Sequence, residues 1–147
     1  MSLRDSHPCI VVLDDERQVR SSLAGALRAA NPHWEVMEAS RSHDALQAVI
    51  RDRVAVLICD QELADRSGVD VLAEARALSP DTVGILLLDR IDGASCLDSV
   101  NVAGAFRCLH KPFQAYHFVT DVAESIGEHR RRSAVQRLIE QMQGARA

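Results

Sequence analysis

The chain alternates short, fully apolar segments with stretches in which apolar residues recur every three or four positions. The apolar runs are typical of strands buried on both faces of a sheet, and they cover residues 9–13, 54–59 and 83–88. Two further strands are predicted from alternating or mixed patterns, over residues 34–39 and 105–109. Helical spacing predicts helices over residues 19–30, 42–50, 68–78 and 94–102, and from residue 114 almost to the end.

Five β-α units in succession predict an α/β fold. We expect a doubly wound, five-stranded parallel sheet of order 2-1-3-4-5, with helices on both faces and an extended C-terminal helix. In such sheets the working site lies beyond the carboxyl ends of the strands. Charged residues lie at or just after the ends of four of the predicted strands, namely Asp14, Asp15, Asp60, Asp89 and Lys111. The pattern therefore predicts that four carboxylates and one ammonium meet at a single edge of the sheet.

Composition narrows the class of protein. With 147 residues, 47% of them hydrophobic and a net charge of −4, the chain is expected to be one soluble globular domain. The acidic balance argues against direct nucleic-acid binding, and no apolar run approaches the ~20 residues of a membrane span. Four scattered cysteines form no CxxC pair, so a reducing cytoplasm is expected. Lys111 is the only lysine in a chain that otherwise uses arginine.

The charged edge indicates a particular chemistry. Asp14, Asp15 and Asp60 follow strands expected to be neighbours, and their carboxylates would repel one another without a cation between them. Mg²⁺ is the expected cofactor because it prefers oxygen ligands, and the main-chain carbonyl of Glu62 is a candidate additional ligand. Lys111 adds a point charge suited to a phosphoryl group. Carboxylates, Mg²⁺ and a lysine together predict phosphoryl transfer onto a carboxylate.

These residues resemble the receiver domains of bacterial two-component response regulators over about residues 8–128. The matching elements are Asp14-Asp15, Asp60, Gly68 and Lys111-Pro112-Phe113, in that order and at family spacing. The resemblance implies that Asp60 is the phosphoacceptor, modified by a sensor histidine kinase or phosphotransfer protein. It also implies that Asp14 and Asp15 hold Mg²⁺ and that Lys111 pairs first with Asp60 and then with the phosphoryl oxygens.

Two switch positions depart from the family pattern. Receivers usually carry Ser or Thr where this chain has Asp89, and a carboxylate cannot replace a hydroxyl as a hydrogen-bond donor. The usual aromatic residue is replaced by Cys108, while Phe106 lies two residues earlier, on the same strand face if the strand period of two applies. The Met-Pro pair usual after the acceptor is Leu63-Ala64. We therefore hypothesise that phosphorylation is chemically possible but that the switch is altered.

Residues 129–147 are expected to form a helical extension, or a linker to an output domain missing from this chain. Apolar residues recur there at helical spacing: Val135, Leu138, Ile139 and Met142. This spacing suggests either a short coiled coil in a homodimer or a helix packed on its own domain.

Two alternatives to the phosphorylated receiver stay open. One is a phosphorylation-independent scaffold that dimerises. The other is a phosphotransferase or phosphatase with Asp14 as nucleophile, although such enzymes usually space their acids as D-x-D.

Overall fold

A computed structural model of the chain describes residues 7–89, 96–97, 100–101 and 103–146. Its centre is a five-stranded parallel sheet of order β2-β1-β3-β4-β5, which confirms the predicted order 2-1-3-4-5. The strands are β1 (Cys9–Leu13), β2 (Glu35–Ala39), β3 (Val54–Asp60), β4 (Val83–Leu88) and β5 (Arg107–His110). β1, β3 and β4 are the apolar runs of the sequence, and nearly all their residues are buried.

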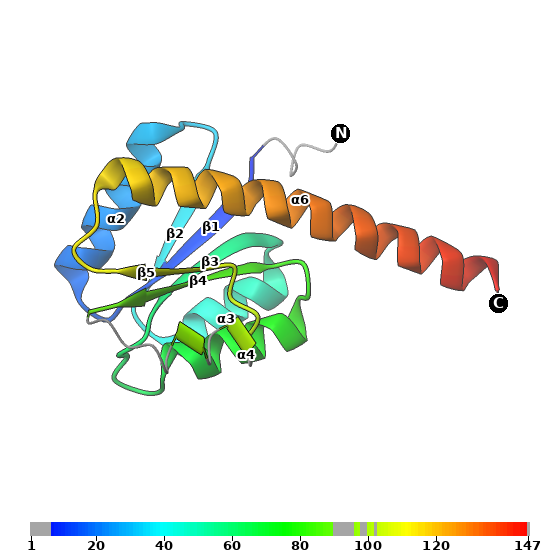
Figure 1. The fold of residues 1–147 in the computed structure, drawn as a ribbon, viewed down its shortest axis with the longest axis horizontal. Helices are drawn as coiled ribbons and strands as arrows, with labels where there is room; N and C mark the ends of the chain where they lie inside the picture. The colour runs from blue at the N-terminus through cyan, green and yellow to red at the C-terminus, as the bar shows by residue number, and fades with distance from the viewer. Residues whose placement is uncertain (1–6, 90–95, 98–99, 102, 147) are drawn as a thin grey trace.

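Helices cover both faces of the sheet (Figure 1). They are α2 (Arg17–Ala30), α3 (Ser42–Arg51), α4 (Gly68–Leu78) and the long α6 (Ala115–Ala145). One core cluster joins α2 and α6 to one face of the sheet, and a second joins α3 and α4 to the other face. This two-layered core confirms the doubly wound α/β class. The helix expected over residues 94–102 lies largely outside the described residues.

Element boundaries agree closely with the sequence pattern except at β5. This strand begins at Arg107 rather than at residue 105. Gly104 has a φ of +64°, in the left-handed region that favours glycine, so the chain still turns just before the strand. Phe106 directly precedes the strand, and its amide donates to the carbonyl of Gly84 on β4 at 2.8 Å. Its position on the same face as Cys108 stays a prediction.

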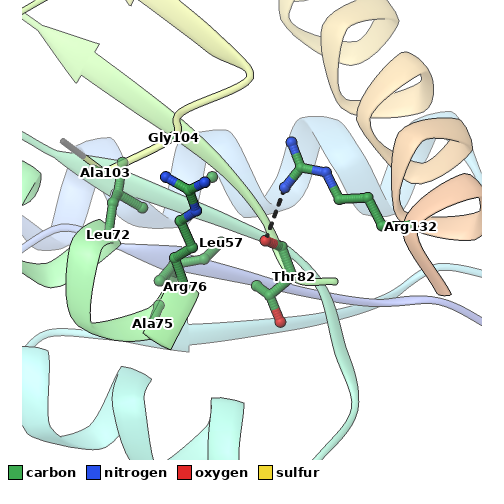
Figure 2. A pocket seen from close by; sticks show the side chains of 9 residues that line it. Leu57, Leu72, Ala75, Arg76, Thr82, Ala103, Gly104 and Arg132 are labelled. Atoms are coloured by element: carbon green, nitrogen blue, oxygen red, sulfur yellow. Dashed lines mark hydrogen bonds between the residues drawn. The ribbon is translucent and has the colours of Figure 1, made fainter. Parts of the chain in front are cut away.

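Helix α6 is attached to the start of β4, at the sheet edge opposite the charged strand ends. The Nδ1 atom of His129 lies 2.7 Å from the carbonyl oxygen of Asp81, and the hydroxyl of Ser133 donates to the Asp81 carboxylate at 2.8 Å. Arg132 donates to the carbonyl of Thr82 at 3.4 Å, the contact drawn in Figure 2. In the same view Arg76 of α4 lies across a small cavity that Arg132 also lines. These contacts fix one face of α6 against residues 81–82.

Beyond Ser133 the helix leaves the domain. The buried side chains of α6 end at Ser133, whereas the following turns project past the sheet (Figure 1). Four apolar side chains on this projecting part are between 42% and 56% exposed: Val135, Leu138, Ile139 and Met142. The helix runs without interruption across the expected domain boundary at residues 128–129.

Gly68 opens α4 and lies directly beneath the end of β3. Its amide donates to the carbonyl of Gln61 at 2.9 Å, so the helix starts in close contact with the strand end. A Cβ atom at this position would overlap the carbonyl oxygen of Asp60 and lie 2.8 Å from a methyl carbon of Leu86. The absence of a side chain is therefore what allows α4 to approach Asp60.

We expect Gly68→Ala to lower the free energy of unfolding by about 1–3 kcal/mol, because backbone at the end of β3 must shift to admit the methyl group. Gly25→Ala is the matched control, since its Cβ would meet nothing within 4 Å on α2. That change should raise the free energy by about 0.5–1 kcal/mol. Urea unfolding of the two variants checks both signs, and equal effects would contradict the close-approach explanation.

The attachment of α6 should also depend on pH. Burial raises the pKa of Asp81, but hydrogen bonds from Ser133 and Ser79 outweigh burial and hold the pKa below its ordinary value. The stability that this ionised carboxylate contributes is present at neutral pH and is lost as pH falls from about 5 through the lowered pKa. We expect Asp81→Asn to flatten the acid limb of the stability curve, measured by urea unfolding from pH 7 to pH 3. Parallel curves for wild type and variant would refute this, and Asp44→Asn, at an exposed position on α3, serves as the control.

Candidate functional site: an acidic edge around Lys111

The carboxyl ends of four adjacent strands bring charged residues together. The strands are paired in register almost to their ends, with Leu13 opposite Cys59, and Leu88 opposite His110. The amide of Lys111 continues this ladder and donates to the carbonyl of Leu88 at 2.7 Å. Residues that follow β1, β4 and β5 therefore lie at the same level as Asp60, the last residue of β3.

The Lys111 ammonium lies among three carboxylates. Its Nζ atom is 3.3 Å from Oδ2 of Asp60, 3.3 Å from Oδ1 of Asp89 and 3.6 Å from Oδ2 of Asp14. The Asp14 and Asp60 side chains are only 1% and 8% exposed, whereas that of Asp89 is 49% exposed. The structure thus brings three of the predicted carboxylates around the ammonium of a fourth predicted site residue, Lys111.

Backbone amides hold the two buried carboxylates. Oδ1 of Asp14 accepts from the amide of Glu16 at 2.9 Å, and Oδ1 of Asp60 accepts from the amide of Glu62 at 3.3 Å. In each case the other oxygen faces Lys111. Both carboxylates are therefore oriented by the chain segment that immediately follows them.

The protonation of this site reflects competition between burial and charge. Burial raises the pKa of Asp60 above its ordinary value, the Lys111 ammonium opposes that rise, and the Asp14 carboxylate adds to it. Burial by itself lowers the pKa of Lys111, but Asp60, Asp14 and Asp89 outweigh it and raise that pKa above its ordinary value. Lys111 therefore stays charged at neutral pH, where its charge offsets the crowding of carboxylates.

The expected cluster of Asp14, Asp15 and Asp60 is not assembled as a three-carboxylate site. Among the described residues no three His, Cys, Asp or Glu side chains are placed to hold a metal ion together. Asp15 is exposed and accepts from the amide of Ala64 at 2.9 Å, while Asp14 is buried. The cause is local, because consecutive residues after a strand direct their side chains to different sides.

A cation nevertheless fits the donors that are present. Oδ2 of Asp14 is fully buried and has no hydrogen-bond partner in the described part of the chain, although it faces Lys111 at 3.6 Å. A buried acceptor without a donor is costly, and a cation would satisfy it. Mg²⁺ is commonly held by one or two carboxylates together with waters, so Asp14 and Asp60 suffice as protein anchors. The backbone of Glu62 adjoins Asp60, which is where the candidate carbonyl ligand was expected.

The other two switch positions, Cys108 and Phe106, lie in β5 and directly before it. Cys108 is half-buried and packs against the core cluster shared with α3 and α4. The Phe106 ring lies under the guanidinium of Arg107, 4.2 Å from its carbon, and Arg107 pairs with Glu124 on α6 at 2.9 Å. The peptide bond between Lys111 and Pro112 is cis.

Sequence reasoning missed one residue that supports the site. Arg20 of α2 donates to the carbonyl of Asp14 at 2.8 Å and lies 3.5 Å from the Glu38 carboxylate on β2. It thereby fixes the backbone that carries the buried Asp14. Its helical position gives no sign of this contact, which depends on how α2 packs beside the end of β1.

No helix in the described part of the chain is both long enough and apolar enough to cross a membrane. Comparison with known proteins points to one family. The family model described as "Response regulator receiver domain" matches residues 10–123.

Curated relatives include the hydrogenase transcriptional regulatory protein HoxA of Cupriavidus necator. It is 27% identical over 124 residues, which cover 84% of this chain and 25% of HoxA. The probable transcriptional regulatory protein TcrX of Mycobacterium tuberculosis is 32% identical over 114 residues, or 77% of this chain and 47% of TcrX. The chain thus spans between a quarter and a half of these relatives.

The solved structures include the CheY-like receiver domain protein of Methanospirillum hungatei. It superposes with a TM-score of 0.79 at 22% identity and covers 86% of this chain and 98% of the solved chain. That likeness concerns the fold. Together with the family model over most of the chain, it leads to one conclusion: this chain is a receiver domain of the two-component response regulator family.

Proposed function

We propose that this receiver accepts a phosphoryl group on Asp60 from a phosphohistidine on a sensor histidine kinase or phosphotransfer protein. The observation that carries the proposal is the placement of the Lys111 ammonium 3.3 Å from Asp60 and 3.6 Å from the unsatisfied oxygen of Asp14. Phosphoryl transfer needs a nucleophilic carboxylate, a second carboxylate that can bind a cation, and a positive point charge. Asp60, Asp14 and Lys111 supply these three groups.

The reaction would proceed by attack of an Asp60 oxygen on phosphorus. A new O–P bond forms as the P–N bond to the donor imidazole breaks, and the leaving imidazole recovers its electron pair and takes up a proton. Lys111 neutralises charge on the transferred oxygens as a mobile point charge. The amide of Glu62 holds the Asp60 carboxylate in place while its other oxygen reacts. Slow hydrolysis of the acyl phosphate returns the domain to its starting state.

Receiver domains of this fold generally bind Mg²⁺ at the acidic pocket, and we propose the same here. Asp14 and Asp60 would hold the ion, with Asp15 acting through water and the carbonyl of Glu62 as a further ligand. When bound, Mg²⁺ supplies positive charge that offsets the negative charge of the phosphoryl group.

We further propose that residues 8–128 act as the cytoplasmic receiver unit and that residues 129–147 connect it to an output domain or partner. The relatives HoxA and TcrX are regulatory proteins about four and two times the length of the matched region, which supports such an arrangement. The projecting part of α6 is the physical connection, and it carries the exposed apolar residues between Val135 and Met142.

A second candidate function is a receiver that acts as a dimerisation scaffold without phosphorylation. The observation that favours the scaffold is the ion pair between Lys111 and Asp89. In this pair the Asp89 carboxylate already binds the ammonium that a phosphoryl group would need. Accessibility of Asp60 to a phosphodonor decides between the two functions.

Acetyl phosphate with Mg²⁺ should place a single phosphoryl adduct on Asp60, located by intact mass and by borohydride reduction with peptide mapping. Asp60→Asn should abolish the adduct, and chelation of Mg²⁺ should prevent it. Asp44→Asn, an exposed carboxylate on α3, is the matched control and should retain it. Absence of any adduct would favour the scaffold, and an adduct on Asp14 would favour an enzyme of related topology.

The charge of Lys111 should matter to stability separately from phosphorylation. Lys111→Met leaves the buried Asp14 and Asp60 carboxylates without their cation, and we expect a loss of about 1–3 kcal/mol in unfolding free energy at pH 7. Lys111→Arg keeps the charge and should stay within about 1 kcal/mol of wild type, yet weaken the coupling of phosphorylation to conformation. Arg28→Met, which breaks a surface pair with Glu38, is the control for removing an exposed cation. A loss as small for Lys111→Met as for this control would be the contrary result.

The projecting helix should associate with a second copy. Val135 and Leu138 stand at successive a and d positions of a heptad, and a β-branched residue at a with leucine at d favours two-stranded coiled coils. We expect sedimentation analysis to find a reversible dimer that Leu138→Asp shifts to monomer. Gln143→Asp adds the same charge at an exposed b position off this seam and should leave the dimer intact. A wild-type monomer at every concentration would contradict the association.

A further inference from the structure

The Lys111 ammonium already has three negatively charged partners before any phosphoryl group arrives. Its Nζ atom donates to Oδ2 of Asp60 at 3.3 Å and forms ion pairs with Asp89 at 3.3 Å and with Asp14 at 3.6 Å. A phosphoryl oxygen that is to be bound by Lys111 must therefore compete with these carboxylates for its positive charge.

Asp89 is the carboxylate held least firmly. The Asp14 and Asp60 side chains are buried, and each also accepts a hydrogen bond from a backbone amide. Asp89 is half-exposed, and its carboxylate forms an ion pair with Lys111 at 3.3 Å. The backbone of Lys111 cannot follow a departing Asp89 freely, because its amide is bonded to the carbonyl of Leu88.

Phosphorylation would also add negative charge close to Asp89. Phosphorylation converts the single negative charge of Asp60 into an acyl phosphate that carries up to two charges. Oδ2 of Asp60 and Oδ1 of Asp89 are each 3.3 Å from the same nitrogen, so they are no more than twice that distance apart. At such a separation salt screens the repulsion little, since the Debye length at physiological ionic strength is about 8 Å.

We propose that phosphorylation of Asp60 expels the Asp89 carboxylate from Lys111 toward solvent, and that this outward displacement at the end of β4 is the conformational signal. The inference rests on the proposed function of Asp60 and specifies how phosphorylation of Asp60 changes the conformation of the domain. Asp89 is a positioning residue: in the resting state it holds the ammonium, and in the phosphorylated state repulsion drives it away. A hydroxyl at this position would be drawn toward the phosphoryl group, whereas the carboxylate moves in the opposite sense.

The experiment uses beryllofluoride with Mg²⁺, which mimics the acyl phosphate, on the full 147-residue chain. Its affinity is measured for wild type, Asp89→Asn, Asp89→Glu and the exposed-carboxylate control Asp44→Asn. We expect Asp89→Asn to bind at least about tenfold more tightly, because the repulsion is removed while the side-chain shape is kept. Asp89→Glu keeps the charge and should stay within about threefold of wild type, as should Asp44→Asn. Melting curves confirm that each variant is folded, and Asp89→Ser provides a second uncharged variant.

NMR measures the displacement of the Asp89 carboxylate independently. On beryllofluoride addition, the carboxyl carbon of Asp89 in wild type should change its chemical shift from that of an ion-paired group to that of a solvated one. The amide of Lys111 should keep its hydrogen bond to Leu88.

Equal affinities for wild type and Asp89→Asn, or a tightening in Asp89→Glu as large as in Asp89→Asn, would overturn the inference. So would an unchanged Asp89 carboxyl signal in a domain that has bound beryllofluoride. If acetyl phosphate leaves no adduct on Asp60 in any variant, the proposed function itself fails. An adduct on Asp60 with charge-independent affinities leaves that function standing and refutes only the role of Asp89.

Discussion

The site depends on a single ammonium that several carboxylates share in a largely buried place. Removing two carboxylates from water is unfavourable unless a cation and hydrogen bonds compensate for the loss of hydration. Lys111 and the amides of Glu16 and Glu62 provide that compensation for Asp14 and Asp60. The strand ends must therefore stay level, because a shift of β5 would remove the ammonium from its partners. The backbone bond from Lys111 to Leu88 maintains this alignment.

Strand β4 connects the acidic edge with the projecting helix. Its carboxyl end leads into Asp89, and the residues before it, Asp81 and Thr82, are bonded to His129, Arg132 and Ser133 of α6. The strand lies between β3 and β5 and is almost wholly buried, so it is stiffened by packing on both faces. A displacement at Asp89 thus acts on the same strand that anchors α6. Spatial continuity of this kind is a route along which the state of Asp60 can reach the helix.

Much of the fold was predictable because buried parallel strands have a distinctive sequence pattern. The boundaries of β1, β4 and α4 match the apolar pattern residue for residue. The start of β5 was less predictable, since the left-handed turn at Gly104 delays the strand, which begins at Arg107. The proximity of four charged residues was predictable from their placement at strand ends: Asp14, Asp60, Asp89 and Lys111. The separate position of Asp15, which accepts a hydrogen bond from the amide of Ala64, was not predictable from that placement.

By itself, the sequence determined the α/β class, the strand order and the edge where charge collects, because hydrophobic periodicity and strand-end chemistry are local properties. It also supplied Asp89 where a hydroxyl is usual. Only the tertiary structure decided which carboxylates share Lys111, how exposed each is and which second bonds hold them. It alone attached α6 to Asp81 and Thr82 and recruited Arg20 to Asp14. These outcomes depend on packing between elements distant in the chain, which no local pattern encodes.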